Sequence, residues 1–118
     1  MGRILVIDDD DAMRGSVRRI LERDGHDVRE AQDGAEGLRV FATDVVVTDL
    51  IMPGKEGIQT IMELREAAPD VSILAVSGGG VGLHHDVLSD ADALGADASL
   101  AKPFTVDQLR SAVVRLLG

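Results

Sequence analysis

Several short apolar segments of this chain each lead into a polar side chain that could take part in phosphoryl or metal chemistry. These side chains are Asp8 and Asp9, Asp49, Ser77 and Lys102. Carboxylates that meet in one crevice repel one another, so either one of them keeps its proton or a cation binds between them. Oxygen ligands without His or Cys indicate a hard cation, and a few carboxylates with water suit Mg²⁺.

Lys102 and Ser77 would add a positive charge and a hydroxyl donor opposite the acids, a pairing that suits a phosphoryl group. Each residue also has a plainer interpretation. The acidic run 8–11 could cap the helix that follows, although its last two residues are better placed for that role. Asp49 could be a solvated loop acid or a helix cap, and Lys102 an ordinary surface lysine.

The segments that lead into these residues have the composition of strands. They cover residues 3–8, 26–31, 44–49, 71–77 and 98–101. The run Val45–Thr48 is typical of a strand buried on both faces of a parallel sheet, whereas 26–31 is more polar, as an edge strand would be. The carboxyl ends of parallel strands meet at one edge of a sheet, so we expect the polar residues to share a site there.

Helical spacing of apolar residues alternates with these strands. The expected helices cover residues 12–25, 35–41, 57–70, 85–96 and 105–118, the last opened by a capping box at Thr105–Gln108. Three of these helices have residues at helical spacing: Met13, Val17, Ile20 and Leu21 fall on one face of the first, Ile58, Ile61, Met62 and Leu64–Arg65 form the pattern of 57–70, and Leu109, Val113 and Leu116 of the last are expected to face the core. Five strands that alternate with five helices predict parallel βαβ units, hence an α/β fold with a doubly wound sheet.

Composition excludes several classes of function. A length of 118 residues suits one compact domain, expected over residues 1–118. A net charge of −9 and only two aromatic residues argue against direct nucleic-acid binding by this domain. The absence of Cys rules out a disulfide framework. No apolar run reaches membrane-spanning length and no signal peptide is evident, so we expect no membrane contact and a cytoplasmic location.

Four motifs occur in the order and spacing of a known family. They are ILVIDDD (residues 4–10), VVTDLIMPG (46–54), ILAVSG (73–78) and GADASLAKPF (95–104). From Arg3 to Leu117 the chain resembles a response-regulator receiver domain of the chemotaxis-regulator-like type. The resemblance implies a flavodoxin-like three-layer sandwich whose five-stranded parallel sheet has the order 2-1-3-4-5.

The resemblance also implies a metal site. Asp49 would be the phosphoacceptor and a ligand of Mg²⁺. Asp9 would bind the ion directly and Asp8 through a water molecule, with the backbone carbonyl of Ile51 as a further ligand. Mg²⁺ is therefore the expected cofactor.

Phosphoryl transfer is the function that the resemblance implies. Lys102, aimed by a cis bond to Pro103, would pair with one phosphoryl oxygen, and Ser77 would hydrogen-bond another. The chain would be a phosphorylation-activated switch of a two-component phosphorelay, with a histidine kinase or a histidine phosphotransfer protein as donor. Its downstream output partner is unknown from the sequence. It would catalyse only its own phosphorylation and slow dephosphorylation, and would otherwise not be an enzyme.

Three positions depart from the family pattern. Ser99 stands where most receivers have an aromatic residue, which in the family swings inward on activation. A serine has too little bulk to report that movement. Ile51 and Gly79, two residues after Asp49 and Ser77, cannot orient a water molecule, so a long-lived phosphorylated state is expected.

Other function classes stay open. A phosphohydrolase of the haloacid-dehalogenase type also uses an Asp in a D-x-D-x-T pattern, but Ala12 replaces the threonine after Asp8 and a cap domain has no room. Ser99 keeps alive a third possibility, an interaction module that no longer responds to phosphate. The basic residues Arg14, Arg18, Arg19 and Arg23 of the first helix would form either a docking face for the donor or an ordinary solvated face.

Overall fold

Five parallel strands form the central sheet, in the order β2-β1-β3-β6-β7. Their bounds are Arg3–Ile7 for β1, Asp27–Ala31 for β2, Val45–Asp49 for β3, Ser72–Ser77 for β6 and Ala98–Ala101 for β7. This computed structural model describes residues 2–8, 10–31, 42–49, 51–52, 55–77, 95–101 and 103–118, with the backbone alone at 51–52, 55–58 and 77. Counted along the chain, the strands of this sheet have the expected order 2-1-3-4-5.

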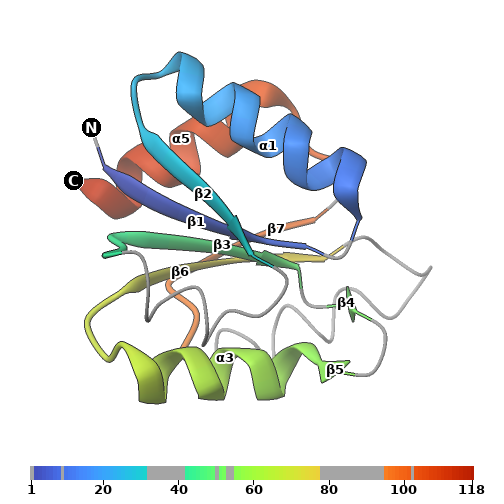
Figure 1. Ribbon diagram of the computed structural model, residues 1–118, viewed down its shortest axis with the longest axis vertical. Helices are drawn as coiled ribbons and strands as arrows, with labels where there is room; N and C mark the ends of the chain where they lie inside the picture. The colour runs from blue at the N-terminus through green and yellow to red at the C-terminus, as the bar shows by residue number, and fades with distance from the viewer. Residues whose placement is uncertain are drawn as a thin grey trace.

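Helices in the described part of the chain cover both faces of the sheet (Figure 1). Helices α1 (Asp11–Arg23) and α5 (Val106–Leu117) pack on one face, and α3 (Gly57–Ala67) packs on the other. This arrangement confirms the three-layer α/β sandwich. The two other expected helices, 35–41 and 85–96, lie outside the described residues up to residue 94. None of the described helices has the length and apolar character that a membrane crossing needs.

Alternating side chains of the inner strands fill a separate core on each face. In β1, Ile4 and Val6 pack on the side of α1 and α5, whereas Leu5 and Ile7 pack on the side of α3. Burying one such side chain stabilises the fold by about 1.5–3 kcal/mol. The inner strands are apolar throughout because both of their faces are covered. In β2, at the edge of the sheet, only Val28 is buried, which explains its polar sequence.

Local sequence signals set the ends of two helices. Asp10 is the N-cap of α1, and its Oδ1 accepts hydrogen bonds from two backbone N–H groups of the first turn, at 3.0 and 3.2 Å. The chain leaves α1 through Gly25, whose φ of +88° favours glycine. At the start of α5, Thr105 Oγ1 accepts from the Gln108 backbone N–H at 3.0 Å, and the Gln108 side chain accepts from the Thr105 backbone N–H at 2.8 Å. The predicted capping box is confirmed.

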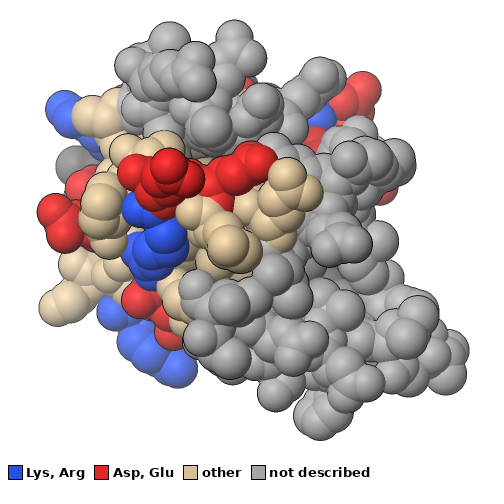
Figure 2. All heavy atoms as spheres, turned by 90° about the horizontal axis from the view of Figure 1, so that it is seen from below, with Lys and Arg blue, Asp and Glu red and all other residues tan. Residues whose placement is uncertain are grey.

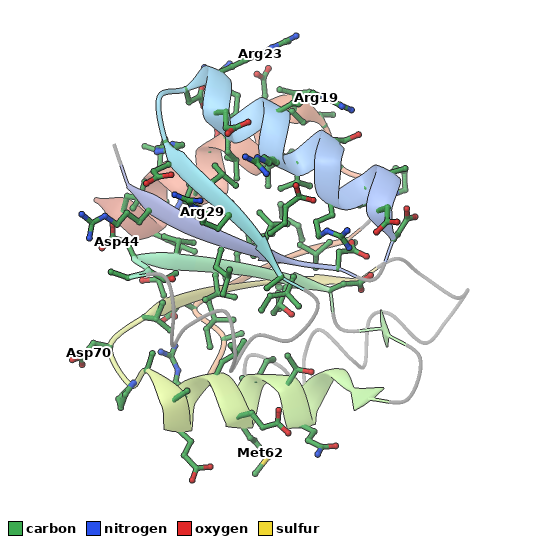
Figure 3. The ribbon with its side chains drawn as sticks, viewed as in Figure 1. Arg19, Arg23, Arg29, Asp44, Met62 and Asp70 are labelled. Atoms are coloured by element: carbon green, nitrogen blue, oxygen red, sulfur yellow. The ribbon has the colours of Figure 1, made fainter. Side chains whose placement is uncertain are left out.

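One apolar residue of the predicted helical pattern in α3 lies outside the core. Met62 is 56% exposed, and Figure 3 shows its side chain pointing away from the sheet. Position 62 lies about 100° around the helix from position 61 and about 160° from position 64. The buried Ile61 and Leu64 therefore turn it outward, and Thr60, only 2% exposed, lies on the core side instead. Figure 2 views the molecule from the side of α3, where acidic and basic side chains are interspersed.

Candidate functional site

Two of the predicted acids stand at the carboxyl ends of neighbouring strands. Ile7 of β1 is paired with Thr48 of β3, so Asp8 and Asp49 follow at the same level of the sheet. Their exposed fractions are only 5% and 7%. Both line one small cavity of about 10 Å³ on the side of α1, and the other residues that line it, Met13 of that helix among them, are apolar. The fold thus brings together two buried carboxylates whose positions are far apart in the sequence.

The turn after β1 holds the Asp8 side chain in a defined direction. Asp8 Oδ1 accepts a hydrogen bond from the backbone N–H of Asp10 at 2.9 Å, a local turn of the kind that Asp favours. Its backbone carbonyl accepts a second bond, from the Arg14 guanidinium, at 2.6 Å. At the end of β3, the Thr48 hydroxyl donates to the Asp49 carbonyl at 3.2 Å. In the turn that follows β1, hydrogen bonds therefore hold both the side chain and the backbone carbonyl of Asp8.

The strand register brings other predicted positions to the same edge of the sheet. Asp49 is paired with Val76, and Ser77, the next residue and the last of β6, is paired with Ala101 of β7. Lys102 follows Ala101 directly but, like Asp9, lies outside the described residues. For Ser77 the backbone alone is described, so its role in hydrogen bonding a phosphoryl group stays a prediction.

A short antiparallel ladder follows Asp49. Its strands are β4 (Ile51–Met52) and β5 (Lys55–Glu56), with Ile51 paired with Glu56. The sequence predicts only a turn at 53–54, which lies outside the described part of the chain. The ladder leads the chain away from the sheet toward α3 (Figure 1). Ile51 begins this ladder, and its carbonyl as a metal ligand stays a prediction.

The donor atoms present fit a small hard cation. Asp8 and Asp49 supply carboxylate oxygens at neighbouring strand ends. Mg²⁺ is commonly held by one or two carboxylates while it keeps several waters. Across the described ranges, no three His, Cys, Asp or Glu side chains surround a common point. Asp9, the third acid that the sequence predicts for this site, lies outside those ranges.

Two arginines of α1 and an acid of β2 surround the turn that follows β1. Arg14, in the first turns of α1, donates from Nε to Glu30 of β2 at 2.9 Å and from its second terminal nitrogen to Asp11 at 2.5 Å. Arg18 donates to the same Glu30 at 2.9 Å. The hydrogen bonds from Arg18 and then from Arg14 lower the pKa of Glu30, and burial opposes them. Nothing local predicts this cluster, because Glu30 meets the two arginines only through the packing of α1 on β2.

The arginines of α1 fall into two groups. Arg14 and Arg18 are paired with acidic side chains, whereas Arg19 and Arg23 are exposed on the outer side of the helix (Figure 3). Arg19 makes one long contact, 3.5 Å, to the Ser16 hydroxyl. The Arg18 side chain is still 40% exposed, so the choice between a docking face and an ordinary solvated face stays a prediction.

Ser99 lies on a groove between β7 and α5. The groove has a volume of about 320 Å³, and its lining residues are Ala98, Ser99 and Leu100 of β7 with Asp107, Gln108, Ser111, Ala112 and Arg115 of α5. The position that carries an aromatic residue in most receivers is thus half-buried beside an open groove.

Sequence comparison places this chain among signalling proteins. The family model for the response regulator receiver domain matches residues 4–114. The chain is 39% identical over 121 residues to response regulator MprA of Mycobacterium sp. strain KMS, an alignment that covers 98% of this chain and 50% of that protein. The chain therefore spans about half the length of the curated relatives it matches.

Solved structures agree. A response regulator receiver domain protein of Clostridium thermocellum superposes with a TM-score of 0.87 at 32% identity, covering 99% of this chain and 94% of that one. The beryllofluoride-activated NtrC4 receiver domain dimer superposes with a TM-score of 0.85 at 28% identity, covering 99% and 97% of the two chains. Fold, family model and relatives agree over nearly the whole sequence. This chain belongs to the family of response regulator receiver domains, the signalling domains of two-component systems.

Proposed function

We propose that residues 1–118 form one receiver domain, a phosphorylation-activated switch in which Asp49 accepts the phosphoryl group in the presence of Mg²⁺. The observation that supports this best is the pair of buried acids, Asp8 and Asp49, at the carboxyl ends of neighbouring strands. Carboxylates at neighbouring strand ends repel each other, and a cation bound between them would offset that repulsion.

Asp49 acts as the nucleophile. One of its carboxylate oxygens attacks the phosphorus of a phosphohistidine, forming a P–O bond while the P–N bond breaks and its electron pair returns to the imidazole. The product is an aspartyl phosphate. Transfer of this kind depends on positioning and charge neutralisation. Mg²⁺, held by Asp8, Asp9, Asp49 and the Ile51 carbonyl, would neutralise charge on the transferring group.

Lys102 and Ser77 bind the transferred group from the other side. The pairing of Ser77 with Ala101 supports this assignment, because it places the end of β6 level with the residue that precedes Lys102. The lysine ammonium pairs with one phosphoryl oxygen as a point charge, and the serine hydroxyl donates to another. The donor is a histidine kinase or a histidine phosphotransfer protein, and the modified state controls an output partner.

The experiment is phosphorylation by acetyl phosphate, followed by intact mass. With Mg²⁺ the wild type should gain one acid-labile phosphoryl group, and without Mg²⁺ or in Asp49→Asn it should gain none. Asp70→Asn is a matched control, since Asp70 is exposed at the far end of the sheet, in the turn before β6 (Figure 3). Full labelling of Asp49→Asn would place the nucleophile elsewhere. No labelling of the wild type would favour an interaction module that does not respond to phosphate.

A further inference from the structure

We propose that Arg14 is a positioning residue for the acidic site: it holds the turn that follows β1 and thereby sets the strength of Mg²⁺ binding. The inference rests on the proposed function, because it takes the acids of this turn as the metal ligands. Arg14 would not touch the ion. It would act through the backbone of Asp8.

The guanidinium of Arg14 bridges three acceptors on different parts of the chain, an arrangement that we call the clamp. One terminal nitrogen donates to the Asp8 carbonyl at 2.6 Å, Nε donates to Glu30 at 2.9 Å, and the other terminal nitrogen donates to Asp11 at 2.5 Å. Only 13% of the side chain is exposed. The planar guanidinium presents its donors in a fixed geometry. Its three acceptors are therefore held at fixed positions relative to one another. A lysine could not make these bonds together.

The atom that Arg14 holds has a direct bearing on the acids. The Asp8 carbonyl belongs to the peptide plane that joins Asp8 to position 9, and a peptide plane rotates as one rigid unit. Fixing this carbonyl therefore fixes the ψ angle of Asp8. That angle sets the direction in which the main chain leaves Asp8. On the other side, Asp8 Oδ1 accepts from the backbone N–H of Asp10. The turn is held through its carbonyl and through its carboxylate.

Arg14 is itself held in place by β2. Glu30 accepts from Arg14 with one oxygen and from Arg18 with the other, both at 2.9 Å. Arg18 is further paired with Glu22 at 3.2 Å. The side chains of Glu30 and Arg14 therefore link the edge strand β2 to the turn that follows β1. Residues that orient the ligands of a metal commonly change its affinity by 10–100-fold when they are substituted.

The charge of Arg14 and its contacts with the turn predict opposite changes in Mg²⁺ affinity when Arg14 is substituted. This difference makes the inference testable. A cation near the site repels Mg²⁺, so the removal of its charge alone would strengthen binding. Loss of the clamp would weaken binding. Because Asp11 and Glu30 already balance the charge of Arg14, we expect the second effect to dominate.

The experiment is a Mg²⁺ titration of wild type, Arg14→Ala, Arg14→Lys and Arg19→Ala, followed by backbone amide shifts because the chain has no Trp or Tyr. Arg14→Ala should bind about tenfold more weakly. Arg14→Lys should be intermediate, since an ammonium can reach the Asp8 carbonyl but cannot hold Glu30 at once. Arg19→Ala removes the same charge from the exposed side of α1. Its Mg²⁺ affinity should stay within about twofold of the wild type, well short of the loss expected for Arg14→Ala.

The outcomes separate the inference from the proposed function. If the wild type does not bind Mg²⁺, the metal part of the proposed function fails and there is no site for Arg14 to position. If the wild type binds and Arg14→Ala binds equally or more tightly, the positioning role is overturned while the proposed function stands. Circular dichroism checks that each variant is folded. Should Arg14→Ala not fold, wild-type affinity in Arg14→Lys would overturn the inference.

Discussion

Arg65 of α3 should contribute more to the stability of this domain than any surface arginine. Its guanidinium donates to the Gly95 carbonyl at 2.6 and 3.0 Å, to Asp97 at 2.6 Å and to the carbonyls of Pro69 and Val71. Asp97 in turn accepts from the backbone N–H of Ile73 at 2.8 Å, at the start of β6. One side chain thus joins the end of α3 to the beginnings of β6 and β7.

The expected cost of Arg65→Ala follows from these contacts. Four acceptor groups lose a charged donor, and a hydrogen bond to a charged group contributes about 1.5–3 kcal/mol. The bonds share one side chain that is 25% exposed, so water replaces some of them and the values do not add. We expect a loss of about 3 kcal/mol, a large fraction of a typical total of about 5–15 kcal/mol. For a chain of 118 residues this lowers Tm by about 12 °C.

Thermal and urea unfolding, followed by far-ultraviolet circular dichroism, measure this change. Arg65→Lys keeps the charge but reaches fewer acceptors, so it should lose about half as much. Arg19→Ala, exposed on α1, should change stability by at most about 0.5 kcal/mol. A loss below about 1 kcal/mol for Arg65→Ala, an amount typical of single substitutions in general, would refute the reasoning.

The remaining predictions concern acid stability, metal binding and phosphoryl lifetime. Hydrogen bonds from Arg18 and Arg14 lower the pKa of Glu30, so the stability they add is present at neutral pH and lost as the pH falls through the lower folded value. Urea midpoints should therefore fall more in the wild type than in Glu30→Gln between about pH 5 and pH 3; equal losses would contradict this. Asp9→Asn should weaken Mg²⁺ binding in a titration more than Asp8→Asn, because only the first would lose a direct ligand; the reverse order would exchange their assigned roles. Ile51→Asn with Gly79→Glu should shorten the life of the aspartyl phosphate, by about tenfold for each good water-orienting contact. An unchanged decay rate, measured by intact mass, would show that water is controlled elsewhere.

Local patterns determine much of this fold. The five strands of the sheet and the capping box of α5 agree with the local sequence patterns, and the strand order agrees with what the family resemblance implies. These features are predictable because an apolar run buried on two faces and a side chain that caps its own backbone need no distant partner. The candidate acids could be named for the same reason, since each stands where a strand ends.

Tertiary structure decides which residues meet. Met62 is apolar and lies beside core positions in the sequence, yet the angle at which α3 packs turns it outward and buries Thr60. Arg14 and Arg65 look like solvated helix residues, but each donates to at least one backbone carbonyl and to an acid outside its own helix. No periodicity encodes such contacts, because a long charged side chain finds its partners only once packing has brought separate segments together. The sequence therefore determines the positions of the acids, and the packing of α1 on β2 determines how the turn that carries Asp8 is held.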